Sequence, residues 1–153
     1  MDAIDVKLLE LLQHNAEMTI QQLSTEVHLS TTPCWKRINQ LKNLGYISKT
    51  VSLVDRKKIG LNVTTMVFVT LNTHDQEKIR IFDETIQQIP EVVECWTITG
   101  GVDYSLRIVT KDIQSYEQFL RKHLLKLPHI LEAQSHVGIT EVKHTTELPI
   151  NVS

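Results

Sequence analysis

The clearest pattern in the sequence is a helical repeat between Leu29 and Ile47. Three apolar residues recur at i, i+4 and i+7, the spacing that aligns side chains on one helix face: Cys34, Ile38 and Leu41. Ser30 is a suitable N-cap, Pro33 falls in the first turn, and Gly45 lies where a helix ends in the left-handed conformation. We therefore predict a helix of about four turns with this stripe buried.

The other face of this helix is polar and basic, and it includes an aromatic residue. Its side chains can hydrogen-bond base edges or meet phosphates: Thr31, Thr32, Trp35, Lys36, Asn39 and Lys42. Two interpretations fit, a DNA-reading face and an ordinary solvated face. Trp35 either contacts DNA or packs, partly buried, against the segment that follows. Arg37 lies between the faces; it either joins Lys42 and Lys49 near the DNA backbone or pairs with an acid such as Glu10.

Two shorter helical patterns precede this stretch. Residues 2–14 place four apolar residues on one face: Ile4, Leu8, Leu11 and Leu12. Thr19 and Gln22 form a T-x-x-Q capping-box pattern that begins a second helix. This helix reaches about Val27, with Ile20, Leu23 and Val27 inward. Two helices joined by a short turn, the second with exposed polar residues, predict a helix-turn-helix. The turn at residues 28–30 lacks the glycine often found there.

After Gly45 the pattern changes twice. Tyr46–Val54 is β-branched and alternating, which predicts a strand pair, or wing, beside the helix-turn-helix. Residues 55–61 are polar and contain a glycine, so they are interpreted as a linker between domains at 1–54 and 62–153. The basic residues 56–58 within it fit phosphate contact and plain solvation equally well.

The second half alternates strands with helices. Strands are expected at residues 63–71, 92–99, 103–110 and about 130–140, and helices at 75–89 and 112–127. In the helix expected at 112–127, the inward residues are expected to be Ile113, Tyr116, Leu120 and Leu124. The order βαββαβ predicts a ferredoxin-like, α+β domain with both helices on one face of an antiparallel sheet. In so small a domain, an uncovered apolar sheet face predicts dimerisation.

Charge is unevenly distributed along the 153 residues. The net charge is −2, but residues 31–60 carry +6 and residues 61–153 carry −4. A basic region confined to one part of an acidic chain favours binding of a polyanion there.

Other kinds of chemistry find little support in the sequence. The seven histidines lack metalloprotease or zinc-site spacing, and Gly100-Gly101 is no dinucleotide-binding motif, so we expect neither an enzyme nor a metal or cofactor. Cys34 and Cys95 are interpreted as reduced thiols. Without a secretory signal or a long apolar run, a cytoplasmic protein with no membrane contact is expected.

Several stretches together resemble the Lrp/AsnC family of bacterial and archaeal transcription regulators. They are D-x-x-D-x-x-L-L-x-L-L-Q from Asp2, LSTTPCWKRI from Leu29, Ile59-Gly60-Leu61, PEVVECWTITGGVDYSLRI from Pro90, and EVKHTTELPI from Glu141. The resemblance covers essentially the whole chain. TTPCWKR is most similar to a subgroup of the family tied to sulfur amino acids.

This resemblance implies a winged helix-turn-helix, then a ligand-binding domain of the RAM or ACT type that dimerises through its sheet. Dimers would assemble into octamers or hexadecamers, with an amino-acid effector bound between dimers. The effector would bind at the turn formed by Thr99, Gly100, Gly101, Val102 and Asp103, through backbone N–H groups and the Asp103 carboxylate. Leu125, Ser135 and Val137 are weaker candidates for the pocket wall. The family usually has an acidic residue and an aromatic at positions 101 and 102, and without the resemblance the turn fits a plain hairpin.

Two functions therefore remain open. The first is a sequence-specific regulator that binds double-stranded DNA and whose assembly or DNA affinity responds to an amino acid. The second is an effector-independent architectural protein that wraps or bridges DNA, which the unusual turn favours. A small sensing domain that regulates an enzyme partner would require the basic region to be incidental.

Overall fold

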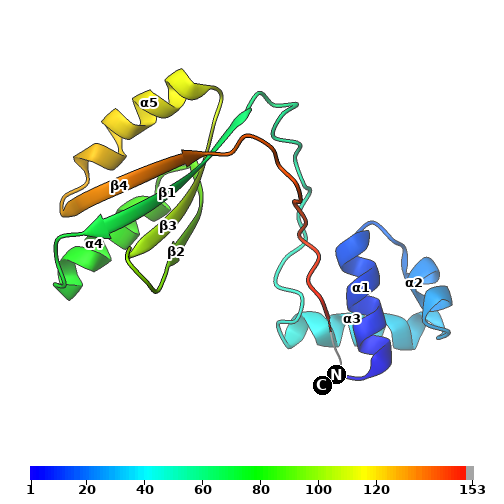
Figure 1. Cartoon of the computed structure of the whole chain (residues 1–153). Helices are drawn as coiled ribbons and strands as arrows, with labels where there is room; N and C mark the ends of the chain where they lie inside the picture. The colour runs from blue at the N-terminus through cyan, green and yellow to red at the C-terminus, as the bar shows by residue number, and fades with distance from the viewer. Residues whose placement is uncertain (151–153) are drawn as a thin grey trace. The chain divides into compact units, whose positions relative to one another are not determined.

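The computed structural model of this chain describes residues 1–150. Contacts between residues divide them into two units (Figure 1). The first contains residues 1–53 together with the C-terminal segment from Val142, and the second contains Val54–Glu141. The chain therefore passes between the units twice. Within residues 1–150, none of the helices is both long and apolar enough to cross a membrane.

The first unit contains the three predicted helices: α1 (Ala3–His14), α2 (Ile20–Glu26) and α3 (Thr31–Asn43). α1 and α2 each begin with a capping box, made by Asp2 and Asp5 and by Thr19 and Gln22. One core joins the helices, and its buried members are Leu8, Leu23, Val27, Cys34, Ile38 and Leu41. The helix-turn-helix and the buried stripe of α3 are thus confirmed.

One end of α3 departs from the expected pattern, and the other follows it. Ser30 occupies the N-cap position, but its side chain makes no capping hydrogen bond. At the other end, Gly45 takes a φ of +80°, and the Tyr46 N–H donates to the Leu41 carbonyl at 2.9 Å, as in a Schellman motif. Between α2 and α3, His28 adopts a φ of 54° at the turn that lacks a glycine.

The strand pair predicted at Tyr46–Val54 does not form. Tyr46–Val54 contains no strand and runs as an irregular extended segment. The physical reason is visible in the sequence, because a strand pair needs a reverse turn and this stretch has no Gly, Pro, Asn or Asp inside it. β-branched alternation alone does not create a hydrogen-bonding neighbour.

The second unit contains a four-stranded antiparallel sheet of order β2-β3-β1-β4. Its elements are β1 (Val63–Leu71), α4 (Gln76–Gln87), β2 (Val92–Thr97), β3 (Tyr104–Thr110), α5 (Ile113–Lys122), a 3₁₀ turn η1 (Leu124–Lys126) and β4 (Ile130–Val137). The predicted α+β, βαββαβ arrangement is confirmed. The last helix is shorter than expected, because it ends at Lys122 and continues only as η1.

One face of this sheet packs against α4 and α5. Alternate residues of β1 and β3 point into that core, including Val67, Val69, Leu106 and Ile108. On α5, Ile113 was expected to be inward but is exposed, and Phe119 is buried instead. Ile113 is the first residue of the helix, where the chain is still leaving the sheet.

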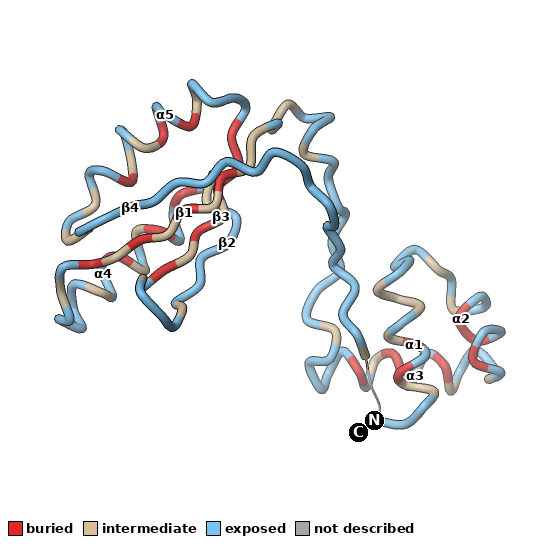
Figure 2. Tube along the Cα trace, in the orientation of Figure 1, coloured by how far each residue is buried: buried red, intermediate tan, exposed pale blue. Residues whose placement is uncertain are grey.

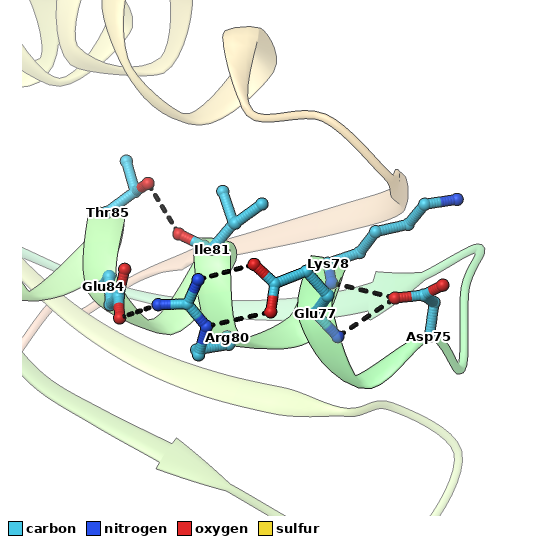
Figure 3. A network of polar contacts seen from close by, with 7 residues as sticks. All are labelled: Asp75, Glu77, Lys78, Arg80, Ile81, Glu84 and Thr85. Atoms are coloured by element: carbon cyan, nitrogen blue, oxygen red, sulfur yellow. Dashed lines mark hydrogen bonds and ion pairs between the residues drawn. The ribbon is translucent and has the colours of Figure 1, made fainter.

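Hydrogen bonds and ion pairs link the polar residues on the outer face of α4 (Figure 3). The Asp75 carboxylate accepts the backbone N–H groups of Glu77 and Lys78 at 3.0 and 3.2 Å. Arg80 then bridges Glu77 and Glu84, one turn to either side. Such exposed pairs stabilise a helix by about 0.3–0.5 kcal/mol each, so the network supports α4 locally and creates no ligand site.

The other face of the sheet is uncovered within one chain (Figure 2). Trp96 is 65% exposed, and the cross-strand register places Phe68 and Met66 on the same face. The face also includes an ion pair between Arg107 and Glu94 at 2.6 Å and an edge contact between Phe68 and His136. Exposed aromatic and apolar side chains together with an arginine are typical of a protein interface.

The C-terminal segment is anchored on the end of α1. The Gln13 side-chain amide donates to the Leu148 carbonyl at 2.9 Å and accepts the Leu148 N–H at 3.0 Å. Next to it, His14 Nδ1 lies 3.0 Å from a Glu147 carboxylate oxygen. The Gln13 side-chain amide therefore pairs with the Leu148 backbone through two hydrogen bonds, as a neighbouring strand would.

Candidate nucleic-acid interface and ligand-binding turn

α3 exposes the face that the sequence indicated for DNA. Because Cys34, Ile38 and Leu41 are buried, the residues between them project to solvent. Trp35 is 56% exposed, and five other candidates are exposed with it: Thr31, Thr32, Lys36, Lys42 and, beyond the helix, Lys49. Because Tyr46–Val54 forms no strand, no strand pair covers Trp35 within residues 1–150.

A shallow depression lies on the same surface. It is lined by Ile20 at the start of α2 and by Thr31, Thr32 and Trp35 on α3. Ile20 was expected to be inward, and it contributes to the core while remaining half-buried. The helical periodicity did not indicate that Ile20 also lines this depression.

Asn39 differs from the other candidates on α3. Asn39 is only partly exposed, and its side-chain amide nitrogen is buried without a hydrogen-bond partner among residues 1–150. A buried donor without a partner is costly, so this side chain is not freely presented to solvent. Its neighbour Lys36 is the better-placed polar group on this face.

Arg37 is engaged inside the motif. One guanidinium nitrogen, Nη1, lies 2.7 Å from an Asp2 carboxylate oxygen and 2.8 Å from an Asp5 carboxylate oxygen. These acids, rather than Glu10, are its partners. The D-x-x-D capping pattern was the signal that could have identified them, because it places both carboxylates at the start of α1. Arg37 therefore ties α3 to α1.

The contact with Arg37 favours the charged form of Asp2. The Asp5 backbone N–H that Asp2 accepts, followed by the Arg37 guanidinium, lowers the pKa of Asp2. In return, hydrogen bonds to Asp5 and Asp2 raise the pKa of Arg37. The ion pair between Asp2 and Arg37 is therefore charged at neutral pH.

The expected linker is an ordered turn at the start of the second unit. The Asp55 carboxylate accepts the N–H groups of Lys57 and Lys58, and Gly60 has a φ of +85°. Arg56 donates to the Leu61 carbonyl and contacts the Glu141 carboxylate at 3.4 Å. Of the basic triplet, only Lys57 and Lys58 are exposed.

The candidate effector turn joins β2 to β3. Thr99, Gly100 and Gly101 are exposed, and Gly100 adopts a φ of +122°, which only glycine takes without strain. A Cβ added to Gly101 would meet no atom within 4 Å. The space that an acidic residue would occupy in the usual family pattern is open, and Val102 beside it is half-buried.

Asp103 has a structural contact that the sequence did not indicate. One carboxylate oxygen, Oδ2, accepts the Leu71 backbone N–H at 2.7 Å, where β1 ends. The Asp103 N–H also donates to the Val69 carbonyl at 2.9 Å. Oδ1 has no hydrogen-bond partner among the described residues, so the carboxylate is oriented by one oxygen and available through the other.

The remaining pocket candidates do not gather around this turn within one chain. Ser135 accepts a hydrogen bond from the Tyr116 hydroxyl at 2.5 Å, on the helix side of the sheet. Val137 pairs with Thr65, at the opposite end of β1 from the turn. Leu125 is 65% exposed on η1, ahead of the edge strand β4, whereas the turn joins the two strands at the other edge.

Comparison with known proteins supplies the family. Residues 64–148 match the Lrp/AsnC ligand-binding domain, and residues 1–48 match a winged helix-turn-helix DNA-binding domain. The first match alone covers more than half of the chain. The chain belongs to the Lrp/AsnC family of transcription regulators.

Individual relatives agree with this assignment over nearly their whole lengths. The DNA-binding transcriptional activator DecR of Escherichia coli is 35% identical over 98% of this chain and 99% of its own. The transcriptional regulator AzlB of Bacillus subtilis is 35% identical over 99% and 96%. This chain is therefore a DNA-binding transcription regulator.

Solved structures share the fold. An AsnC family regulator of Agrobacterium tumefaciens is 38% identical, with a TM-score of 0.94 over 97% of each chain. A transcriptional regulator of Neisseria meningitidis, crystallised in complex with L-Met, is 31% identical, with a TM-score of 0.95 over 99% of this chain and 97% of its own.

We predict that Asp2→Asn lowers the stability of the first unit at neutral pH and that this loss disappears in acid. Asn preserves the N-cap acceptor but removes the charge that Arg37 meets. Because the pKa of Asp2 is depressed in the folded state, its contribution is fully present above its unfolded pKa of about 3.9 and is lost as pH falls through the lower, folded value. Urea unfolding followed by Trp35 fluorescence, in a Trp96→Phe background, measures the difference.

Glu10→Gln is the matched control, because it removes an exposed acid of α1 that makes no contact with Arg37. Its unfolding midpoint at neutral pH should equal that of the parent protein. A loss of stability in Asp2→Asn that is equally large at pH 3 and pH 7 would contradict an ionic contribution from Asp2 and Arg37.

Proposed function

We propose that this chain is a sequence-specific regulator that reads duplex DNA with the exposed face of α3. One observation carries the proposal: burial of Cys34, Ile38 and Leu41 leaves a cationic, hydroxyl-bearing face with an exposed indole. Hydroxyls and Trp35 suit base edges, and Lys36 suits phosphate. In this assignment residues 1–54 bind DNA, residues 55–61 link, and residues 62–153 bind the effector and oligomerise.

The groups nearer the DNA backbone are proposed to be Lys42 and Lys49, which are exposed. Arg37 has a supporting role, since its guanidinium is occupied by Asp2 and Asp5 and positions α3. Asn39 contributes to base contact only if its buried amide turns outward. A dimer would present two recognition helices to half-sites about one DNA turn apart, so the operator should be nearly palindromic.

We further propose that an amino acid is the effector and that it binds at residues 99–103. The family's ligand-binding domain and the L-Met complex of the Neisseria relative support this. So does the geometry of Asp103, since Leu71 orients one carboxylate oxygen and leaves Oδ1 available for an ammonium group. Backbone N–H groups at Gly100 and Gly101 would meet the carboxylate. Leu125, Ser135 and Val137 would contribute only from neighbouring protomers.

One observation favours the architectural alternative. The turn is open at Gly101, and Lys57 and Lys58 are exposed on a well-ordered turn, where they can grip a DNA backbone without reading sequence. The effector experiment below separates the two functions.

Lys36→Ala should weaken binding to every duplex and make the slope of log K against log salt concentration less negative by about 0.9, the value for one phosphate contact. The salt dependence can be measured by fluorescence anisotropy with a labelled duplex. Lys78→Ala on α4, a similarly exposed lysine of the other unit, should leave the slope unchanged. An unchanged slope for Lys36→Ala would remove this residue from the interface.

A thermal-shift screen against the twenty amino acids and homocysteine should identify one chemical class that raises the midpoint of the parent protein. Binding only to the folded state adds about 2.7 kcal/mol at a concentration of 100 Kd. Asp103→Asn should lose this shift while keeping the midpoint of the ligand-free protein, because an amide oxygen still accepts the Leu71 N–H. Asp75→Asn, which also retains a backbone acceptor, is the control and should respond as the parent does.

Two results would change the effector proposal. An undiminished shift in Asp103→Asn would exclude Asp103 as the ammonium partner. The absence of a shift with any amino acid, together with intact DNA binding, would favour the architectural function.

We propose that the uncovered sheet face forms a homodimer, from which octamers assemble. Trp96→Glu should weaken dimerisation at least about tenfold, since a carboxylate would be buried against Phe68 and Met66 of an apolar interface. Sedimentation velocity across a concentration series measures this. Ile113→Glu, at an exposed apolar residue on the helix side, is the control and should not change the dimer. An unaltered dimer in Trp96→Glu would place the interface elsewhere.

A further inference from the structure

The depression at the start of α2 and α3 combines apolar lining with full access from solvent. Ile20 and Trp35 supply the apolar surface, and Thr31 and Thr32 supply hydroxyls at its border. Trp35 is 56% exposed. An indole carries a large apolar surface, so a partner that covers it removes that surface from water.

Nothing in the described part of the first unit requires Trp35 to be a tryptophan. The core beneath α3 is completed by Cys34, Ile38 and Leu41, and Trp35 is turned away from that stripe by one helical step. The segment after α3, which could have covered the indole as a wing, forms no strand. Within the described part of the first unit, the indole is therefore left uncovered and accessible to another molecule.

The surroundings select the kind of molecule. Two threonine hydroxyls border the depression, and the next residue, Lys36, adds an exposed positive charge. The charge and hydroxyls suit a polyanion, and the Ile20–Trp35 surface suits an apolar group carried by that polyanion. Among the groups that base pairs present in the major groove, the C5-methyl of thymine is the apolar one.

We propose that Ile20 and Trp35 receive the C5-methyl group of one thymine in each half-site and so specify a T·A pair there. This inference rests on the proposed function of α3. It adds a residue outside the recognition helix, Ile20, to the determinants of specificity. The hydroxyls of Thr31 and Thr32 would then contact the polar edges beside that methyl.

The test removes only the methyl. A high-affinity duplex is first selected from a random pool with the parent protein, and each thymine is then replaced singly by deoxyuridine. At one thymine per half-site, the substitution should weaken binding about fourfold, the change expected for losing burial of one methyl-sized group. Trp35→Ala should bind thymine and deoxyuridine equally at that position, and Ile20→Ala should show a reduced difference.

Leu44→Ala is the matched control. Leu44 is 63% exposed at the other end of α3, outside the depression, so this variant should retain the full preference for thymine. Circular dichroism of each variant checks that the three helices remain folded.

Each alternative result is decisive. A parent protein that is insensitive to deoxyuridine at every position, or a preference that persists in Trp35→Ala, overturns the inference while leaving DNA binding by α3 intact. A uniform loss of affinity in Trp35→Ala, with no effect of the methyl, also overturns it and indicates packing on the sugar-phosphate backbone. Failure of the parent to bind any duplex at low salt overturns the proposed function as well.

Discussion

Burial of one stripe of α3 determines how the rest of the first unit can function. Cys34, Ile38 and Leu41 are almost completely withdrawn from solvent against α1 and α2. Once that stripe is buried, the rotation of α3 about its axis is fixed, and so is the set of side chains that it presents. Arg37, at the border of the stripe, adds a charged tie to the start of α1. A recognition surface depends on such rigidity, because contacts to bases require side chains held in position.

The second unit uses a different constraint. A strand has two faces, and the helices α4 and α5 cover only one face of the sheet. Val67 and Leu106 therefore belong to the core, while their neighbours Phe68 and Met66 on β1 must face away from it. β3 begins directly after the turn and pairs with β1 in the antiparallel direction. Asp103 therefore lies within reach of the last residues of β1.

Much of this architecture could be predicted from the sequence because its signals are local. Capping boxes, helical periodicity and proline or glycine positions gave each helix, and β-branched runs gave each strand of the sheet. The wing was predicted wrongly because the same β-branched signal at Tyr46–Val54 has no turn to fold it back. Local chemistry determines whether a residue suits a strand, but a partner determines whether one forms.

The candidate sites were less predictable because they depend on contacts between distant residues. Arg37 was recognised as a possible ion-pair residue, yet its partners lie 32 and 35 positions away, where sequence offers several acids. The Asp103 contact with Leu71 and the inward amide of Asn39 are likewise three-dimensional facts. Ile20 was assigned to the core, and only the structure shows that one side of it lines an open depression.

The tail contact joins two segments that are far apart in the sequence. Gln13 and Leu148, whose peptide group it pairs with, are separated by 135 positions. The first unit is therefore discontinuous in the sequence. The sheet unit, Val54–Glu141, is inserted between residues 1–53 and the segment that begins at Val142. This contact can therefore form only after the whole sheet unit has been synthesised, because Leu148 follows it in the sequence.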